Sequence, residues 1–454
     1  MITTLKNHPL KTIVALAIIA RVAVLLLFPS VFAFEQTGAI HGSEAYDEYA
    51  LNLLETGIYG RTPGVPDAAI PPLYSYALAL VYGIFGRGYL QVGLFHTLLD
   101  VLSIVMLYEI ARRVFPQYGR AVGLLAGLFY ALYPYLIFQN LTLIDTPFFI
   151  TVLHAFVLLV VILWEQETMT RRGWLVAVGA GIVLGLSMLA RPITPPLAIL
   201  VAVWFLFKYS FIETVRRLLP VAVLSAAILV PWIIRNYGIY DAFVPMTTTS
   251  GANFWQGNSE WTIPVFRAGY DVQWTAPDTQ APRNTREADA ERFALALDFL
   301  RDNPEKIPEL IWVKFLVHWS IDIAPRYNPQ PGEQFILNEN GELEVVRTGE
   351  TIPGVTDANA SYDEPLFDVV GRWIHRFYYG TLFILALVGA VVSWRWWRAV
   401  AILWFVQISM TLIYIIFHPA TRYRVPTDPL LFTFSAYALI WLWGRWRARQ
   451  QLAS

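Results

Sequence analysis

The sequence predicts an all-α membrane protein in which a bundle of about ten transmembrane helices carries a smaller region outside the membrane. Of its 454 residues, 56% are hydrophobic and only 15% are charged, a balance that excludes an ordinary water-soluble domain. Apolar runs of about the 20 residues that a spanning helix needs recur along the chain. Lysines and arginines gather in alternate connections between these runs, which is the pattern of cytoplasmic loops.

Charge and cysteine content narrow the classes of function. The formal net charge is -1, so nothing indicates a nucleic-acid partner. There are no cysteines, which excludes disulfides, zinc–thiolate sites and a cysteine nucleophile. The sequence contains no phosphate-binding loop, dinucleotide-binding fingerprint or HExxH zinc motif, and we expect no cofactor.

Ten apolar runs are interpreted as spanning helices. The first is too long and too poorly terminated for a cleaved signal peptide, so we expect it to be retained. In chain order the runs are Thr12–Phe32, Leu90–Ile110, Ala121–Phe138, Phe148–Trp164, Trp174–Leu189, Pro195–Phe207, Leu218–Ile234, Phe377–Trp394, Ala399–Phe417 and Pro429–Trp443. A shorter run, Pro72–Gly86, would break the alternation of charge if it crossed, so we interpret it as an interfacial helix.

The orientation follows from the basic residues. Both termini and every even-numbered connection are basic, which predicts a multi-pass plasma-membrane protein with cytoplasmic termini. Five arginines on the outer side run against this trend, namely Arg61, Arg87, Arg191, Arg422 and Arg424. We expect an anionic ligand to hold them there; the alternative is that they meet lipid phosphates or neighbouring carboxylates.

The chain divides into three regions at the change from apolar to polar sequence. Residues 1–236 are expected to form an amino-terminal transmembrane module, whose first outer loop covers residues 34–89. Residues 237–376 form the one sizeable outer region, and residues 377–454 form a carboxy-terminal transmembrane module.

The outer region has its own helical patterns. One helix is predicted at Arg286–Arg301, and a second, over residues 304–319, becomes increasingly apolar and is expected to lie back on the membrane. The stretch Pro325–Pro365 is rich in Asn, Gly, Pro and acids and is interpreted as loop.

The first outer loop contains an amphipathic helix, residues 43–57, that offers acids at the membrane edge. Ser43 is a candidate N-cap, and Glu44, Asp47 and Glu48 share one face at helical spacing. The other face is aromatic and apolar, as expected of a helix lying on a membrane. A carboxylate here suits a general base. The alternative is that the acids only complement the helix dipole.

Four further segments place polar residues at the outer edges of spans. Asp145 follows the third span, Arg191 ends the fifth and Arg235 ends the seventh. The fourth segment, HPATRYRVPTDP, supplies His418, Arg422, Tyr423 and Arg424. Arginines at such positions are costly to keep without a partner, so we expect these segments to bind substrate.

His96 and Asp100 stand four residues apart inside the second span. An ionisable pair within a membrane is a functional hypothesis by default. Because Asp100 falls at mid-membrane, far from the outer site, we favour an internal hydrogen-bonded pair.

The order and the amino-acid sequences of these segments resemble those of the GT-C glycosyltransferases, in particular the family 39 group of ArnT-like and protein O-mannosyltransferase-like enzymes. The matching segments cover nearly the whole chain and read YDEYALNLLETGIY, PPLYSYALALVYGIFG, LIDTPFF, LARP, PWIIRNYGIYDAFVP, GANFWQGN, NPEKIPELIWVKF and RYRVPTDPLL. Each is weak alone, and the ordered set is specific for the family without specifying a substrate. The resemblance implies a GT-C-type bundle with interfacial helices in the first outer loop.

The resemblance also implies an activity. A glycosyltransferase of this group moves a sugar from a polyprenyl-phosphate carrier to an acceptor on the outer face, with inversion, using an acid of the first outer loop as base. At the positions where family members often carry that acid, this chain has Gly42 and Ser43. We therefore predict Glu44 as the base, with Asp47 second and Glu48 third; the remaining alternative is that the base is absent.

Roles for the other segments follow from the same resemblance. Asp145 matches a family aspartate and is expected to assist, to position the sugar or to pair with an arginine. The residues expected to contact phosphate or sugar are Arg191, Arg235, His418, Arg422, Tyr423 and Arg424. We expect no metal, because one carboxylate cluster without histidine is thin support for such a site. The expected partners are the lipid-linked donor, membrane lipids and an acceptor of unknown kind.

Two other functions stay open. A transporter or flippase for lipid-linked sugars would carry internal repeats and spans broken at mid-membrane, whereas this chain shows no repeat and keeps its prolines and arginines at outer edges. A non-catalytic relative that only binds a lipid-linked sugar is favoured by Gly42 and Ser43.

Overall fold

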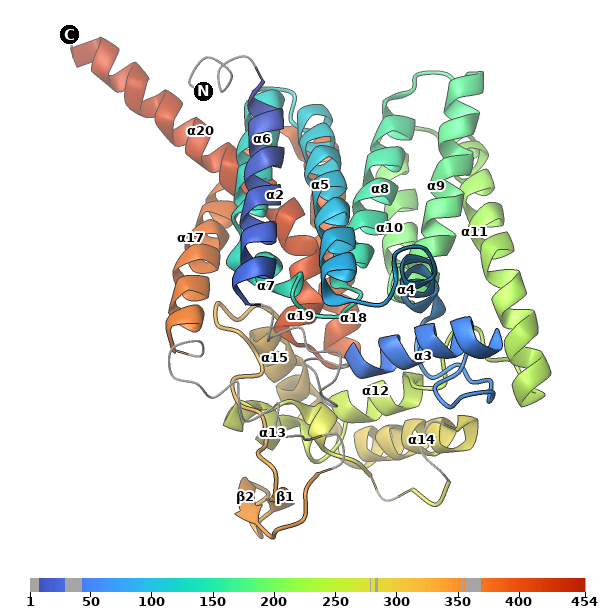
Figure 1. The fold of residues 1–454 in the computed structure, drawn as a ribbon. Helices are drawn as coiled ribbons and strands as arrows, with labels where there is room; N and C mark the ends of the chain where they lie inside the picture. The colour runs from blue at the N-terminus through green and yellow to red at the C-terminus, as the bar shows by residue number, and fades with distance from the viewer. Residues whose placement is uncertain are drawn as a thin grey trace.

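The computed structural model describes residues 8–28, 43–277, 279–281, 285–352, 355 and 369–453. Its main body is a bundle of upright helices; residues 250–347, which we call the cap region, cover one end of it (Figure 1). The bundle helices are α2 (Pro9–Leu27), α5 (Tyr89–Val114), α6 (Gly119–Ala131), α8 (Thr146–Glu165), α9 (Arg171–Ala190), α10 (Pro195–Leu206), α11 (Phe211–Tyr240), α17 (Gly371–Val392), α18 (Trp397–Ile416) and α20 (Asp428–Ala453).

Each of the ten expected spans corresponds to a helix of this bundle. Within the described ranges, eight helices are long and apolar enough to cross a membrane. The other two, α6 and α10, have 13 and 12 residues. The run predicted at Ala121–Phe138 is divided because the chain turns after α6 and Pro134 begins a separate helix, α7 (Pro134–Gln139). The run at Pro72–Gly86 forms α4 (Pro72–Phe85), which is shorter than a span.

Two glycines allow α9 and α11 to approach closely. A Cβ on Gly181 would lie 2.8 Å from the backbone oxygen of Val221, and one on Gly185 would lie 2.7 Å from the Cβ of Ile228. A spacing of four residues puts both glycines on one face, as in other close contacts between membrane helices. The contact fixes α9, and with it the residue that follows its last turn, Arg191.

Charged groups inside the bundle bond to partners on other helices. Asp100 of α5 accepts hydrogen bonds from Arg21 Nε at 2.5 Å and from the Tyr130 hydroxyl at 2.7 Å. His96 Nε2 instead lies 2.7 Å from the hydroxyl of Tyr74 on α4. The expected pair between His96 and Asp100 is therefore wrong. Both side chains are fully buried, and each bonds to residues of other segments instead of to the other.

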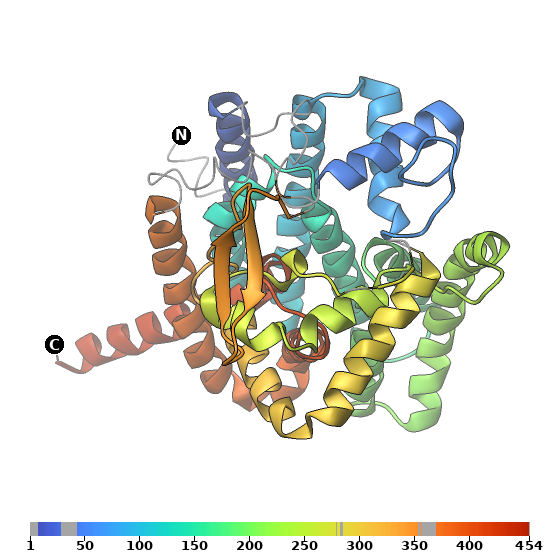
Figure 2. The ribbon, with the colours of Figure 1, turned by 90° about the horizontal axis from the view of Figure 1, so that it is seen from below.

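The cap region consists of short helices and one hairpin. Its elements are α12 (Ser250–Gly257), α13 (Thr262–Ala268), η2 (Val272–Trp274), α14 (Arg286–Asp302), η3 (Pro304–Lys306), α15 (Ile307–His318), β1 (Glu333–Leu337) and β2 (Leu343–Arg347). The two helices predicted in this region are confirmed as α14 and as η3 followed by α15. Figure 2 shows α14 and the hairpin lying over the end of the bundle.

Part of the loop predicted at Pro325–Pro365 is in fact a β-hairpin. The strands pair antiparallel, with Phe335 opposite Val345. Between them, the residues that we interpreted as loop supply the turn, where Gly341 has a φ of 73°. Phe335 is buried against Tyr270 of the cap region, so an apolar contact holds the hairpin in place. Residues 353, 354 and 356–365 of the predicted loop lie outside the described residues.

A buried lysine joins two helices of the cap region. Lys314 of α15 is 1% exposed, and its Nζ donates to the backbone oxygen of Gly257 at 2.9 Å and to Asn258 Oδ1 at 3.0 Å. These acceptors lie at the carboxy-terminal end of α12, where helix carbonyls lack partners within the helix. Burial lowers the pKa of Lys314 to about 7.

We expect Lys314 to make the stability of the cap region depend on pH. Its ordinary pKa is 10.5, so between about pH 7 and 10.5 the unfolded chain binds a proton that the folded chain has released. The free energy of unfolding should therefore rise with pH across this window, by roughly 4–5 kcal/mol. Below about pH 7 the folded protein should carry the full cost of burying the charged Lys314 ammonium group. The melting temperature of Lys314→Met, measured against wild type from pH 7 to 10, should lack this rise. The exposed residue Lys306 provides the control, since Lys306→Met should follow wild type; equal pH slopes in all three proteins would refute the assignment.

Candidate active site

The acidic helix of the first loop lies across the cap end of the bundle as α3 (Ser43–Thr56) (Figure 1). Asp47 is held there by two neighbours: its Oδ1 accepts from the Tyr82 hydroxyl at 2.8 Å, and its Oδ2 lies 2.6 Å from Arg87 Nη2. Glu48 pairs with Arg61 at 2.5 Å near the surface. Arg61 and Arg87 thus pair with neighbouring carboxylates, as Arg191 and Arg424 also do, so four of the five arginines expected on the outer side have such a partner.

Glu44 occupies the first turn of α3, and its side chain lies outside the described residues. The helix itself includes Ser43, which was expected as the residue flanking it. What the structure establishes for Glu44 is the place of its backbone, one turn before Asp47 at the end where α3 begins.

A buried ion pair joins the ends of α8 and α9. Asp145 immediately precedes α8, and Arg191 follows the last turn of α9. Both Nε and Nη2 of Arg191 donate to the Asp145 carboxylate at 2.6 Å. The side chains are 5% and 10% exposed. Of the three roles expected for Asp145, this geometry matches pairing with an arginine.

One nitrogen of the Arg191 guanidinium has no hydrogen-bond acceptor among the described residues. This nitrogen, Nη1, is buried. A buried guanidinium N–H without an acceptor is costly, because it has lost its hydrogen bonds to water and gained none in the protein. Such groups are therefore normally satisfied in folded proteins. An anionic ligand, or a water that the ligand displaces, would satisfy it.

The segment after α18 adds a second incompletely bonded arginine. Arg422 lies on α19 (Thr421–Arg424) and donates to the Tyr423 hydroxyl at 2.7 Å and to Gln273 Oε1 at 3.3 Å. Its Nε is buried without an acceptor among the described residues. Tyr423 stacks on Tyr414 of α18, with ring centroids 4.9 Å apart, which fixes the ring beside Arg422.

His418 lies in the turn that leads into α19. Its Nδ1 is 3.4 Å from the backbone oxygen of Asn253, and its Nε2 is buried without a partner in the part of the chain that the structure describes. Burial lowers the pKa of His418, so the ring is neutral near pH 7. Because the Asn253 carbonyl oxygen can only accept, Nδ1 carries the proton, and Nε2 of the neutral ring can accept one hydrogen bond from a ligand.

Tyr46 of α3 links these groups. Burial raises the pKa of its hydroxyl, the charge of Asp145 raises it further, and the charges of Arg191 and Arg422 oppose the shift. Asp145, Arg191 and Arg422 are therefore all near enough to the Tyr46 hydroxyl to influence its charge. We call the set the cap-end cluster; its members are Tyr46, Asp145, Arg191, His418, Arg422 and Tyr423.

Two of the expected ligand-binding arginines lie elsewhere and have internal partners. Arg235 donates to the backbone oxygens of Tyr59 at 2.5 Å and Asp67 at 3.0 Å, which fastens the loop after α3 to α11. Arg424 is fully buried and pairs with Asp428 at 3.2 Å, and its Nη2 is buried without a partner among the described residues. Their position at span ends is as predicted, but their observed contacts serve the structure.

Sequence reasoning missed two members of this neighbourhood. Tyr46 was assigned to the membrane-facing side of its helix, and Asp271 lies in a polar stretch without a pattern. Asp271 is buried, and its charge acts on both His418 and Arg422. No sequence signal marked Asp271, because only the folded cap region brings it near the cluster.

Carboxylate and imidazole groups do not gather into a metal site in the described part of the chain. No group of three or more such side chains converges there. Asp47 and Asp145 are each occupied by an arginine, which competes with a cation for the same oxygens.

The bundle, with polar segments gathered at one end beneath a cap, is that of a multi-pass membrane protein with the GT-C fold. A family model described as Dolichyl-phosphate-mannose-protein mannosyltransferase matches residues 69–234, which is less than half of the chain. No curated protein matches the chain in sequence.

Solved structures carry the same fold at low identity. The oligosaccharyltransferase AglB from Archaeoglobus fulgidus, in complex with an inhibitory peptide and a dolichol-phosphate, superposes with a TM-score of 0.56 at 16% identity, over 99% of this chain and 52% of that one. An Archaeoglobus fulgidus oligosaccharyltransferase in the apo form gives 0.54 at 15% identity, over 99% of this chain and 52% of that one. ArnT from Cupriavidus metallidurans bound to undecaprenyl phosphate gives 0.41 at 16%, over 92% and 77%. The chain thus spans about half the length of the AglB chain.

Proposed function

We propose that this protein is a membrane glycosyltransferase that moves a sugar from a polyprenyl-phosphate donor to an acceptor on the outer face, with inversion. The observation that carries the proposal is that Arg191 and Arg422, two buried arginines whose charges both act on Tyr46, each have one N–H donor without an acceptor among the described residues. The match to the mannosyltransferase family model and the lipid phosphate in the AglB complex support this class of donor.

The arginines would hold the departing lipid phosphate. As the bond between the anomeric carbon and the phosphate oxygen breaks, negative charge grows on the phosphate. Arg191 Nη1 and Arg422 Nε are N–H donors already buried at the cap end, so they need little reorganisation to meet that charge. Asp145 would then act as a positioning residue, since its two hydrogen bonds set the plane of the Arg191 guanidinium.

An acid of α3 would take the acceptor proton. Glu44 remains our first choice, and Asp47 the second, because Asp47 must release Arg87 or Tyr82 before it can act as a base. His418 and Tyr423 would contact the sugar or phosphate beside Arg422. The cap end would face outwards, with both termini in the cytoplasm.

The proposal is tested by turnover in purified protein. Full-length protein in nanodiscs, given decaprenyl-phosphate mannose and decaprenyl-phosphate arabinose in turn, should release decaprenyl phosphate from one of them when a membrane extract supplies the acceptor. Transport of the lipid-linked sugar across vesicles without release would favour a flippase. Binding without release under any condition would favour the non-catalytic relative.

A further inference from the structure

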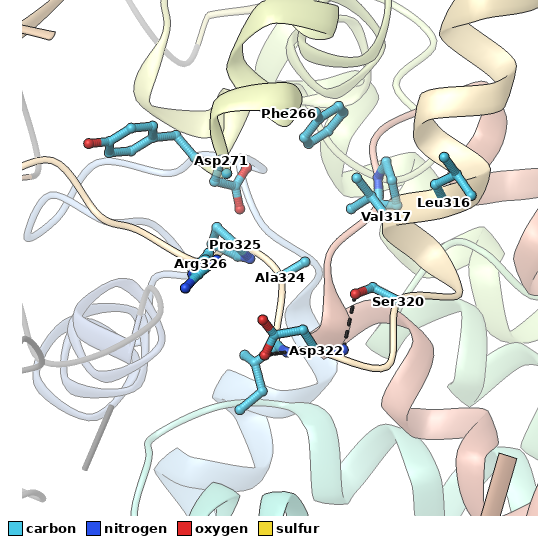
Figure 3. Close-up of a pocket in the computed structure, with 13 residues that line it drawn as sticks. Phe266, Asp271, Leu316, Val317, Ser320, Asp322, Ala324, Pro325 and Arg326 are labelled. Carbon is cyan, nitrogen blue, oxygen red and sulfur yellow. Dashed lines mark hydrogen bonds between the residues drawn. The ribbon is translucent and has the colours of Figure 1, made fainter. Parts of the chain in front are cut away.

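A pocket lies in the cap region beside the cap-end cluster (Figure 3). Its volume is about 210 Å³, and it opens between α13, α15 and the segment 320–326. Among the residues that line it are Phe266, Asp271, Val317, Asp322, Pro325 and Arg326. Pro419, the neighbour of His418 in the chain, also lines it, so the pocket adjoins the turn that leads to α19.

Asp271 lines the pocket and has few hydrogen-bond partners, so its carboxylate can bind a ligand there. It is 2% exposed, and the hydrogen bond that its Oδ1 accepts within the described residues comes from the backbone nitrogen of Gln273 in its own turn, at 3.0 Å. No cation among the described residues lies within salt-bridge distance of it. In Figure 3 its carboxylate points into the space bounded by Ala324 and Pro325. A buried carboxylate with so few partners is one that a ligand can satisfy.

The second acid of the pocket is already neutralised. Asp322 is bonded to Arg376, and Arg372 Nη1 lies 3.7 Å from its other oxygen. On the pocket wall, Arg326 is anchored by its backbone nitrogen, 2.7 Å from the oxygen of Gly269. The pocket therefore offers the Asp271 carboxylate as an acid without an ion-pair partner among the described residues, and Arg326 lines the wall beside it.

The walls between these groups are apolar. Phe266, Val317 and Pro325 face the space in Figure 3. A phosphate would be repelled by the Asp271 carboxylate, which has no ion-pair partner among the described residues. Arg372 and Arg376, which pair with Asp322 at the edge of the pocket, disfavour a second cation there. A neutral ligand with an apolar face and several hydroxyls on its rim suits such a pocket, because a few polar groups within apolar walls fix its orientation.

We infer that this pocket is a subsite for one pyranose ring, whose hydroxyls donate to Asp271 and accept from Arg326. The inference rests on the proposed function, since it gives sugar transfer a second sugar-binding position next to the cluster that holds the phosphate. Phe266, Val317 and Pro325 would receive the C–H face of the ring. The ring belongs to a sugar acceptor or to the donor, and the recognition chemistry is the same in both cases.

Saturation-transfer NMR on full-length protein in nanodiscs tests the subsite, with methyl α-mannopyranoside and methyl β-glucopyranoside as probes. Asp271→Asn keeps an oxygen for the Gln273 N–H, so the turn should survive, while the charged acceptor is lost. We expect wild type to bind at least one glycoside and Asp271→Asn to bind it about tenfold or more weakly. Asp298→Asn, an exposed acid of α14 paired with Arg301, is the matched control and should bind as wild type does.

Arg326→Gln gives an independent arm should Asp271→Asn fail to fold, and it too should weaken binding. Displacement of the glycoside by decaprenyl-phosphate mannose, but not by decaprenyl phosphate, assigns the ring to the donor; retention assigns it to the acceptor. No saturation transfer with either probe, or wild-type affinity in the folded variants, overturns the subsite. Decaprenyl-phosphate binding, measured separately by native mass spectrometry, tests the proposed role of the cap-end cluster. A failure of the sugar subsite can therefore be told apart from a failure of the proposed function.

Discussion

Replacing Glu44 by glutamine is expected to lower sugar transfer by about 10²- to 10⁴-fold, which is the usual contribution of a positioned general base. Glutamine keeps the size and helix propensity of glutamate, so α3 should form normally. The measurement is the initial rate of decaprenyl-phosphate release in nanodiscs, with donor binding followed in parallel. A base variant should retain that binding, because the proposed mechanism assigns the phosphate to Arg191 and Arg422.

The neighbouring acids provide the comparison. Glu55→Gln lies on the same helix, in its exposed last turn, and should leave the rate unchanged. Asp47→Asn removes the partner of Arg87, so if Asp47 serves to position α3, Arg87→Gln should lower the rate by a similar factor. If Asp47 is the base, Arg87→Gln should instead retain most of the activity. Full activity in both Glu44→Gln and Asp47→Asn would rule out the acidic helix as the source of the base.

The location of α3 could be predicted from the sequence because it depends on local pattern. A run of acids at helical spacing between two apolar runs specifies an amphipathic helix at a membrane edge, whatever the rest of the chain does. The same reasoning located the bundle helices, whose apolar length is a local property. The same reasoning predicted the third span as one helix, whereas the chain turns before Pro134 and forms two helices, α6 and α7.

The state of each acid could not be predicted, because it depends on partners that are distant in sequence. Asp47 meets Arg87 forty positions later, and Asp145 meets Arg191 forty-six positions later. The sequence showed five outer arginines and a set of outer acids without indicating which would pair. Arg235 illustrates the limit: its charge suggested phosphate, yet its donors are used by two backbone oxygens of the first loop.

Replacing Arg191 by methionine should have the second large effect, on both stability and donor binding. The change leaves Asp145 buried without its partner, which typically costs about 3–5 kcal/mol. It also removes a donor to the developing phosphate charge, which is worth about 10²- to 10³-fold in rate. The expected result is a lower melting temperature together with weak decaprenyl-phosphate binding in native mass spectrometry. Arg267→Met, which removes an exposed arginine of the cap region, should leave both readouts close to wild type.

The double variant Arg191→Met/Asp145→Asn separates the two effects. Removing both charges eliminates the unpaired carboxylate, so much of the lost stability should return, as it does when buried ion pairs are replaced as a unit. Phosphate binding should not return, because the guanidinium is absent in both variants. Asp145→Asn alone keeps the guanidinium and one of its two acceptor oxygens, so it should bind decaprenyl phosphate more strongly than Arg191→Met does. Wild-type phosphate affinity in the stable double variant would mean that Arg191 serves only to pair Asp145, and that the phosphate is held elsewhere.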